Sequence, residues 1–330
     1  MNLQLSIGFA SNPRTWPILD GRVRCDGVDL VPSIVAASEL FWRQLRFADF
    51  DVSEMSISSF MITLSRGDDR WIGLPIFTTK HFFHAPLMVR KDAGINTPAD
   101  LKGKRVGVLE YQQTAALWVR GALQHEFGVR PQDMEFFMER TPSHSHGGAT
   151  GFTPPPGVTV HQIPEEKNVG TMMVSGELDA ALYYHTDPTL VHRSAIDLTK
   201  NPDIKFLFGD PHAEAVRYYR KTGIFPINHA MVIRRTLAEK HPWLILNLLK
   251  AFDAANAIAN RERMAQVEYY LDAGFLPPEA RKALQEPLLQ HGIRANRTVL
   301  EAAAQYSHEQ GLTPRLMTLP EMFAASTLDQ

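Results

Sequence analysis

Residues 97–108, which read TPADLKGKRVGV, carry the signals of a short helix followed at once by a strand. Thr97 is a favourable N-cap residue, Pro98 suits the first helical position, and the carboxylate of Asp100 suits the first turn. The glycine in the KGK triplet ends this helix, and residues 106–109 then read as a buried strand. This order predicts an α/β fold.

The chain before this stretch alternates between strand and helix patterns. Predicted strands cover residues 3–9, 28–31 and 50–52, and predicted helices cover residues 38–47 and 56–64. A β-α-β-α-β order is typical of a mainly parallel sheet, with ligand-binding loops at the carboxyl ends of its strands.

The chain after this stretch continues the alternation and then becomes helical. The predicted elements are strands 87–90, 135–138, 178–184 and 230–234, and helices 113–127, 168–175 and 211–222. From Thr236 onward the sequence is almost entirely helical, with breaks at Pro277-Pro278 and at Gly292.

One long segment, residues 141–157, reads TPSHSHGGATGFTPPPG. Its glycines and prolines exclude a regular element, so we predict a long loop. Two interpretations remain open for this loop. It is either a solvated excursion or a lid that brings His144 and His146 over a bound ligand.

Composition and charge narrow the functional class. A chain of 330 residues can form two cores of ordinary size, and a net charge of −2 without a basic run argues against nucleic-acid binding. The single cysteine, Cys25, excludes an intrachain disulfide and is expected to be a bystander thiol. The chain contains no apolar run of membrane-helix length and begins without a secretory signal pattern, so we expect a cytoplasmic protein without membrane contact.

Several motifs resemble the type II periplasmic-binding-protein-like fold. They are VRKD at 89–92, PADLKGKRVGV at 98–108, GELDAA at 176–181 and AMVIR at 230–234. This resemblance implies an α/β architecture of two lobes joined by a two-crossing hinge, followed by a helical C-terminal region. The first lobe would comprise residues 1–90 plus 228–330 and the second residues 91–227. The hinge would lie near Arg90 and Ile227, with a ligand cleft between the lobes.

A narrower resemblance covers nearly the whole chain. EYQQTAALWVRG at 110–121, HSHGGATGF at 144–152, YRKTGIFPI at 219–227 and GLTPR at 311–315 are similar to the 4,5-dihydroxyphthalate decarboxylase family. The chain departs from that family at Lys80 and Phe83, where arginine is frequent, and at Asn228, where methionine is frequent. The resemblance implies removal of one carboxylate from 4,5-dihydroxyphthalate, giving protocatechuate and CO2 without an organic cofactor.

Two other functions remain open on the same fold. A solute-binding protein for a small aromatic or carboxylate anion would use the same cleft, although such a transport receptor should be exported. Another cytosolic enzyme on this fold is the further alternative. The helical C-terminal third offers surface for self-association, so we also expect a homo-oligomer.

The expected substrate, a small aromatic carboxylate, requires cations or hydrogen-bond donors for the carboxylate that remains. Arg14, in the loop after the first strand, can hold a carboxylate with two hydrogen bonds, although a surface role is the alternative. Gln113 and Thr114 open a helix whose free N–H groups favour anions, and Ser58 starts another, although all three also fit simple capping. Lys80 near the hinge is a further candidate cation.

The reaction also requires a base for the phenol and an acid for the ring carbon. Glu110, at a predicted strand end, is a candidate base, or it pairs with a nearby lysine or arginine. His84, His185 and His229 are the acid/base candidates, because each is expected near the cleft and histidine titrates near neutral pH.

A divalent metal site is the competing interpretation of some of these residues. His144 and His146, with Glu110 or His84, have side chains that hold divalent ions. The sequence contains neither an HExxH motif nor a Cys/His cluster, so we expect no metal.

Overall fold

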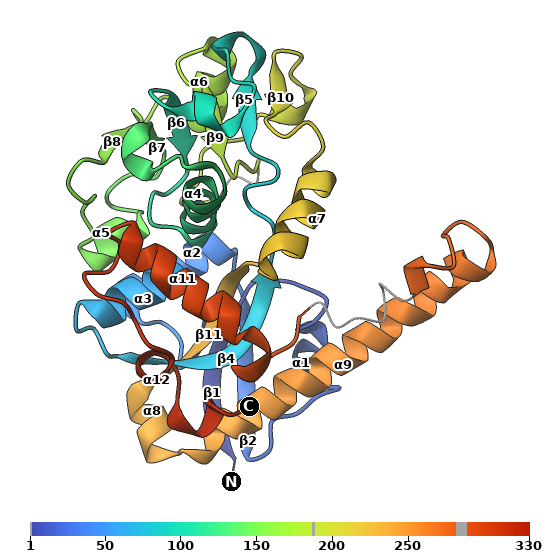
Figure 1. The fold of residues 1–330 in the computed structure, drawn as a ribbon. Helices are drawn as coiled ribbons and strands as arrows, with labels where there is room; N and C mark the ends of the chain where they lie inside the picture. Colours follow the sequence, from blue (N-terminus) through green and yellow to red (C-terminus); the bar gives the residue numbers. More distant parts are fainter. Residues whose placement is uncertain (1, 187–188, 282–288) are drawn as a thin grey trace.

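The chain folds into two β-sheets, one in each half of the molecule (Figure 1). The computed structural model describes residues 2–186, 189–281 and 289–330. One sheet has five strands in the order β2-β1-β3-β11-β4, and the other has six in the order β10-β5-β9-β6-β7-β8. The α/β, periplasmic-binding-protein-like architecture predicted from the sequence is therefore confirmed.

The five-stranded sheet is built from both ends of the chain. Its strands are β1 (Leu3–Phe9), β2 (Val28–Ile34), β3 (Val52–Ser56), β4 (Trp71–Lys80) and β11 (Ile227–Arg234). Strands β1, β2 and β3 pair in parallel, whereas β11 runs antiparallel between β3 and β4. The sheet is complete only when β11 has returned from the other half of the molecule.

Helices bury both faces of this sheet. Apolar side chains of β1, β4 and β11 pack with α1 (Trp16–Leu19), α8 (Arg235–Lys240) and the first half of α9 (Trp243–Asp272). On the opposite face α2 (Ala37–Phe47) and α3 (Ile57–Ser65) pack against β3. Both faces are therefore apolar, as expected for a mainly parallel sheet.

The six-stranded sheet comes from one continuous part of the chain. Its strands are β5 (Met88–Arg90), β6 (Arg105–Val108), β7 (Glu135–Met138), β8 (Thr159–Gln162), β9 (Ala180–Leu182) and β10 (Ile204–Phe206). Strands β6 to β9 pair in parallel, and β5 and β10 add an antiparallel edge.

Alternate side chains of β6 face different helices, as the two-residue period of a strand requires. Val106 and Val108 belong to the apolar cluster that contains α4 (Thr114–Phe127). A side chain at Gly107 would instead meet α6 (Val169–Ser175) on the other face. The last helix before the return crossing is α7 (Pro211–Thr222).

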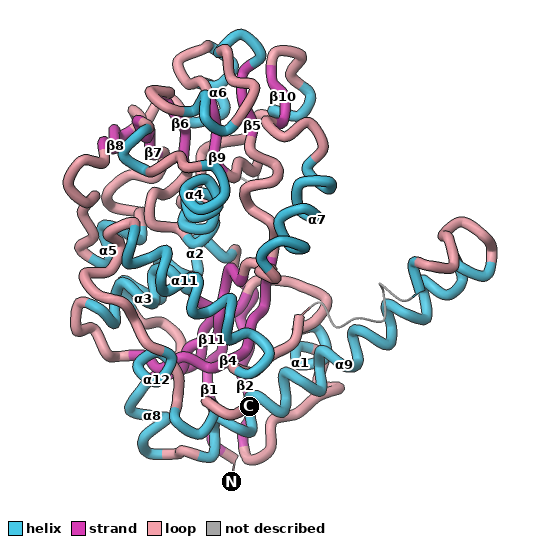
Figure 2. Tube along the Cα trace, viewed as in Figure 1, coloured by secondary structure: helices cyan, strands magenta, loops and turns pink. Residues whose placement is uncertain are grey.

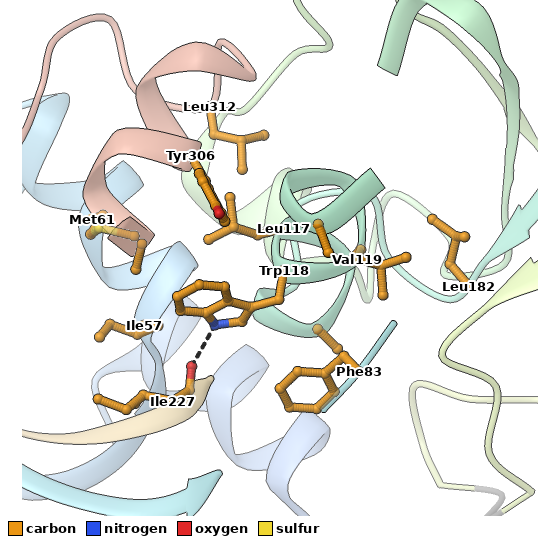
Figure 3. Packing of buried hydrophobic residues seen from close by; sticks show 14 of the residues in the cluster. Ile57, Met61, Phe83, Leu117, Trp118, Val119, Leu182, Ile227, Tyr306 and Leu312 are labelled. Atoms are coloured by element: carbon orange, nitrogen blue, oxygen red, sulfur yellow. Dashed lines mark hydrogen bonds between the residues drawn. The ribbon is translucent and has the colours of Figure 1, made fainter. Parts of the chain in front are cut away.

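Two crossings connect the sheets, one between β4 and β5 and the other between α7 and β11. Trp118 of α4 joins the two halves there: its indole Nε1 donates to the carbonyl of Ile227 at 2.7 Å (Figure 3). Phe83 of the first crossing packs in the same apolar cluster. This cluster contains residues from both halves, so the two sheets share one continuous core.

The C-terminal region is helical, as predicted. Helix α9 extends away from the body of the molecule, and α11 (Arg297–Glu309) and α12 (Leu319–Met322) then return to it (Figure 2). Helix α11 packs closely on α4, because a Cβ atom at Gly121 would lie only 2.1 Å from the ring of Tyr306. Residues 282–288 of the predicted helical region lie outside the described residues.

Two expectations from the sequence need correction. Residues 141–157 are not entirely irregular, since His146–Thr150 form the short helix α5, capped by the Ser145 hydroxyl that accepts from the N–H of Gly148. Strands β4, β8 and β10 were not predicted. The exact lobe boundaries stay a prediction, and β5 at residues 88–90 already belongs to the six-stranded sheet.

Candidate functional site

A cavity of about 270 Å³ lies between the two sheets. Its lining comes from segments that follow strands of both sheets and from the start of β11. The lining residues are Ala36, Ala37, Ser38, Phe41, Ser56, Gln113, Thr114, Ala115, Arg140, His146, Tyr183, His185, Thr189, His192, Asn228 and His229. The sequence predicted a ligand cleft in this position between the two halves.

The parallel strands deliver most of these residues. Ser56 is the last residue of β3, Arg140 follows β7 and Tyr183 follows β9. Their shared position at carboxyl ends is the usual place for a ligand in an open α/β sheet. Tyr183 has a positive φ of 42°, a conformation that costs energy for a non-glycine residue and that often marks a functional position.

Two helices direct their N-termini at the cavity. Ala36 and Gln113 are the N-cap residues of α2 and α4, and neither makes a side-chain capping hydrogen bond. Residues 36–38 and 113–115 both line the cavity. The first N–H groups of a helix have no partner within the helix and carry partial positive charge, so this arrangement favours an anion.

Arg140 supplies a full positive charge at the same place. Its guanidinium is buried and lies 3.4 Å from Oε2 of Glu110, 3.1 Å from Nε2 of His146 and 3.0 Å from Nε2 of His192. Burial lowers the pKa of Arg140, and the nearby charge of Glu110 opposes that shift. Arginine remains protonated in proteins, so the cavity wall carries a fixed cation.

Arg140 sets the tautomers of two histidines. Because a guanidinium only donates, Nε2 of His146 and Nε2 of His192 are acceptors, and each ring carries its proton on Nδ1. The Nδ1–H of His146 donates to the hydroxyl of Ser59 at 3.2 Å. The carbonyl of Ser38 also lies 3.2 Å from Nε2 of His146, but Arg140 excludes the tautomer that would donate to it.

Both histidines are therefore neutral at physiological pH. Burial and the charge of Arg140 lower the pKa of His146 and of His192 well below the usual value. Among the described residues, Nδ1 of His192 has no hydrogen-bond partner, and neither has Nε2 of Gln113. Both residues line the cavity. Two buried donors are thus left for a ligand that accepts hydrogen bonds.

Glu110 lies behind the cavity wall and is absent from the lining. Its carboxylate accepts from the backbone N–H groups of His146, at 3.0 Å, and Gly147, at 3.3 Å, and lies against Arg140. Burial raises the pKa of Glu110, and the charge of Arg140 opposes that shift. Pairing with arginine was the second of the two roles predicted for Glu110. This carboxylate positions Arg140 and the start of α5.

His229, which lines the cavity, forms a buried pair with Glu54. Nδ1 of His229 lies 2.7 Å from Oε1 of Glu54, which also accepts from the Thr78 hydroxyl at 2.5 Å. Oε2 of Glu54 accepts from the N–H of Ala10 at 2.7 Å. Burial alone would raise the pKa of Glu54, but its hydrogen bonds and the charge of His229 lower it, so the carboxylate is ionised.

This pair has the geometry of an oriented acid or base. Since Glu54 occupies Nδ1, the nitrogen of His229 that remains for a ligand is Nε2. The ring also packs edge-on against Phe41 at 4.6 Å between centroids, which fixes its plane.

Four of the predicted site residues come together in the cavity: Gln113, Thr114, His185 and His229. Ser58 lies one layer behind, where its N–H donates to the Thr114 hydroxyl at 3.2 Å. The Ser58 hydroxyl is buried and has no hydrogen-bond partner among the described residues.

The structure does not bring the other three predicted residues to this cavity. Arg14 and Lys80 line a separate, smaller pocket. His84 is buried with Nε2 3.1 Å from Oε1 of Glu214, and its ring packs against Tyr218 at 4.5 Å.

Several cavity residues were missed in the sequence. Arg140 had a usable signal, because it follows β7 as Glu110 follows β6, and the same strand-end rule identifies both. His192 and Tyr183 lie in irregular segments, and Phe41 lies on a helix that the sequence placed in the core. Nothing local marks these three as site residues.

The histidines of the 141–157 segment separate into two environments. His146 lines the cavity, whereas His144 packs on Trp42 at 5.3 Å and contacts the hydroxyls of Thr141 and Ser143. The guanidinium of Arg140 donates to Nε2 of His146 at 3.1 Å. Across residues 2–186, 189–281 and 289–330, no group of three or more His, Cys, Asp or Glu side chains could hold a metal ion.

A family model and a solved structure are similar to this chain and support its fold. A family model described as NMT1/THI5 like matches residues 68–197. The periplasmic aliphatic sulphonate binding protein SsuA from Escherichia coli superimposes with a TM-score of 0.58 and 14% identity, covering 100% of both chains. Fold and cavity together define a periplasmic-binding-protein-like molecule with a cavity between its two sheets.

Two proteins that are similar in sequence identify the family of the chain. The chain is 34% identical to 4,5-dihydroxyphthalate decarboxylase from Comamonas testosteroni over 330 residues, which is 99% of this chain and 98% of the relative. It is also 34% identical to the protein of the same name from Pseudomonas putida over 218 residues, 66% of this chain and 82% of that one. The chain belongs to the 4,5-dihydroxyphthalate decarboxylase family. Across the described residues, no helix combines the length and apolar character needed to cross a membrane.

Proposed function

We propose that this protein is a carboxy-lyase that converts 4,5-dihydroxyphthalate to protocatechuate and CO2, a step of phthalate degradation. The observation that carries the proposal is the placement of an oriented histidine, His229, and a buried cation, Arg140, in the lining of one cavity. The full-length relative with that activity in its name supports the same substrate.

The cavity suits an aromatic dicarboxylate. Arg140, Nε2 of Gln113, Nδ1 of His192 and the N-termini of α2 and α4 supply donors for the carboxylate groups. Phe41 and Tyr183 supply apolar surface for the ring. Binding of a dianion is favoured because no Asp or Glu appears among the described lining residues.

The chemistry follows from the positions of the substituents. Each carboxylate is para to a hydroxyl, so loss of the phenolic proton pushes electron density to the carbon that bears the carboxylate. An acid delivers a proton to that carbon, the bond to the carboxylate breaks, and its electron pair returns to the ring as CO2 leaves. The overall reaction consumes one proton and releases one CO2.

Two different protein groups carry out the two proton transfers, because the phenol oxygen and the reacting carbon lie on opposite sides of the ring. Nε2 of His229, held by Glu54, delivers the proton to the ring carbon. His185, which also lines the cavity, accepts the phenolic proton. Arg140 and the helix N-termini hold the carboxylate that remains.

Three further properties belong to the proposal. We infer that the reaction proceeds without a metal or an organic cofactor, because the phenol itself provides the electron push. The chain acts in the cytoplasm, where small aromatic acids are degraded. It forms a homo-oligomer through the exposed part of α9, where Tyr269 is 75% exposed and Phe275, just beyond the helix, is 78% exposed.

The direct test incubates EDTA-treated protein with 4,5-dihydroxyphthalate and follows the ultraviolet spectrum and CO2 release. Stoichiometric conversion to protocatechuate is the expected result. Turnover only after a divalent ion is added would overturn the cofactor-free reaction. Saturable binding of the aromatic acid without turnover would contradict the proposed enzyme activity and would favour the function of a solute-binding protein.

A further inference from the structure

The described lining of the main cavity has a different chemical character in each half of the molecule. One group of lining residues comes from the start of α2 and from strands β3 and β11 of the five-stranded sheet, and the other comes from residues 113–192 of the six-stranded half. Arg140, which belongs to the second group, is the only lysine or arginine in the described lining. The two carboxylates of a bound dicarboxylate therefore meet unlike surroundings.

Buried hydrogen-bond donors gather in the six-stranded half. Three side-chain nitrogens there have no hydrogen-bond partner among the described residues: Nε of Arg140, Nε2 of Gln113 and Nδ1 of His192. Each of them carries hydrogen, because Arg140 imposes the Nδ1–H tautomer on His192. Gln113 is also the N-cap residue of α4, whose first N–H groups favour an anion. A carboxylate, which only accepts hydrogen bonds, matches this set of donors.

The five-stranded half instead presents Asn228 beside the acid His229. Asn228 is 8% exposed and lines the cavity, and its carboxamide makes no hydrogen bond with another described residue. A carboxamide is neutral and has both donors and an acceptor, so it can bind a polar substituent without a charge. The unpaired group next to the acid is therefore of a different kind from the donors around Arg140.

An irregularity of strand β11 explains why Asn228 and His229 line the same cavity. Ile227 pairs with Lys80 of β4 and His229 pairs with Thr79, so two steps along β11 match one step along β4. Asn228 is the extra residue. Successive side chains of a regular strand face opposite sides of the sheet, whereas a bulge redirects a side chain.

The acid and the cation are close enough for one ligand to reach both. The ring of Phe41 lies 4.6 Å from the imidazole of His229 and 5.9 Å from that of His146, measured between centroids. Nε2 of His146 in turn accepts from Arg140 at 3.1 Å. A single aromatic ring with carboxylates on adjacent carbons can therefore present one carboxylate to each group.

We propose that the cavity has two unequal carboxylate subsites, and that Asn228 is the specificity-determining residue of one of them. An anchoring subsite, formed by Gln113, Arg140 and His192, holds the carboxylate that stays. A reacting subsite, formed by Asn228 beside His229, receives the carboxylate that leaves. Both assignments rest on the proposed function, because His229 is the acid only if the protein is a decarboxylase.

The chemistry favours a neutral group in the reacting subsite. Decarboxylation turns a charged carboxylate into neutral CO2, so a cation bound to that carboxylate would stabilise the ground state more than the transition state. In this subsite the ring carbon takes the proton from His229, the bond to the carboxylate breaks, and its electron pair returns to the ring. A ligand with a single carboxylate places it in the anchoring subsite and leaves Asn228 without a partner.

Calorimetric titration with two ligands that cannot react separates the subsites. Phthalate, which lacks the hydroxyls required for the reaction, fills both subsites, whereas benzoate fills the anchoring subsite alone. We expect Asn228→Met to weaken phthalate binding about tenfold or more, the usual effect of losing a hydrogen bond to a charged group, and to leave benzoate binding unchanged. Gln113→Leu should weaken the binding of both ligands.

Asn96→Met and Gln132→Leu are the matched controls, because both residues are exposed and absent from the described lining. Both control variants should bind the two ligands as the wild type does. If Asn228→Met weakens benzoate as much as phthalate, or weakens neither, the assignment of two unequal subsites is wrong. These titrations need no turnover, so they decide the question even if the protein fails to decarboxylate 4,5-dihydroxyphthalate.

An added charge tests the neutral character of the reacting subsite. Asn228→Lys should bind phthalate about tenfold more tightly and yet lower kcat for 4,5-dihydroxyphthalate about tenfold, because the new cation stabilises the carboxylate that must become CO2. Calorimetry and steady-state kinetics measure the two effects. A kcat that is unchanged or higher in Asn228→Lys, or weaker binding of phthalate, would overturn the place of Asn228 in this subsite.

Discussion

Nη2 of Arg140 donates to Nε2 of His192 across 3.0 Å, and this contact decides which nitrogen of the imidazole carries the proton. A protonated His192 would place two cations side by side in a buried position. The histidine is therefore neutral in the folded protein and leaves its Nδ1–H for the ligand, whereas the unfolded chain protonates it near pH 6.5.

This relationship predicts a pH dependence of stability. A histidine whose pKa is lowered by folding contributes stability that is present above pH 6.5 and is lost as the pH falls below that value. For His192 the loss amounts to about 1.4 kcal/mol per pH unit below 6.5. Urea unfolding at pH 7.0, 6.0 and 5.0 measures the free energy of unfolding at each pH. The substitution His192→Gln should reduce the slope of this free energy against pH.

The comparison must be made between variants, because His146 and His291 are also held neutral and add to the wild-type slope. His161→Gln is the control, since His161 is exposed on β8. If the free energy of unfolding has the same slope against pH in wild type and in His192→Gln, the neutral state assigned to His192 is wrong.

The pair of His229 and Glu54 predicts a kinetic effect. His229→Gln should lower kcat about 10²- to 10⁴-fold, the usual range for loss of a positioned acid or base, with a smaller change in KM. Glu54→Gln should also lower kcat, because a side-chain amide no longer holds Nδ1–H of His229 as an ionised carboxylate does. Steady-state kinetics across pH 5–9 tests both variants.

The two effects should not add in the double variant, since both residues act through the same imidazole. A double variant whose loss equals the product of the single losses would show that Glu54 and His229 act independently.

Arg140 predicts an effect on binding. Arg140→Lys keeps the charge but cannot reach Glu110, His146 and His192 together, because an ammonium lacks the planar fork of the guanidinium. Loss of about 1.5–3 kcal/mol, the contribution of a hydrogen bond to a charged group, would weaken phthalate binding about 10- to 160-fold. Calorimetry measures it.

Arg105→Lys is the matched control for this experiment, because Arg105 pairs with Asp179 at the start of β6 and is absent from the cavity lining. Equal affinities in wild type and Arg140→Lys would remove Arg140 from the anion site.

The exposed aromatics around the end of α9 predict the assembly state. We expect the wild-type protein to be an oligomer, and the double variant Tyr269→Ser and Phe275→Ser to be a monomer, because contiguous exposed apolar surface is usually covered by a partner. Size-exclusion chromatography with light scattering measures the mass. Tyr219→Ser, an exposed tyrosine on α7, is the control. A monomeric wild type would contradict the prediction.

Sequence patterns predicted most of the fold because the strands and helices around β6 obey local rules. The N-cap, Pro and Asp signals at residues 97–100 stand where the structure has a 3₁₀ turn with a capping box at Thr97. Strand β4 was missed because Pro75 interrupts its pattern, and proline is unusual inside a strand. Helix α5 was missed because its two glycines disfavour a helix, which here is held by Ser145 and Glu110.

The candidate site was predicted only in part, for a physical reason. Strand ends, helix starts and the predicted return crossing located Gln113, Thr114, His185 and His229, whose positions follow from the topology. They did not separate these residues from Arg14 and Lys80, which also lie at strand ends but line the smaller pocket. The smaller pocket is lined in part by α9, so the pocket that a strand-end side chain enters depends on how this distant helix packs. No local sequence pattern encodes that packing.

The position of β11 between β3 and β4 has a consequence for the order in which the chain folds. During synthesis β1 to β4 leave the ribosome long before β11. The backbone groups of β3 and β4 that pair with β11 therefore stay unpaired until β11 has been made. Strands β5 to β10, by contrast, emerge as one continuous series. The half of the molecule that is made second is therefore complete first, and the N-terminal half relies on protection from aggregation until β11 arrives.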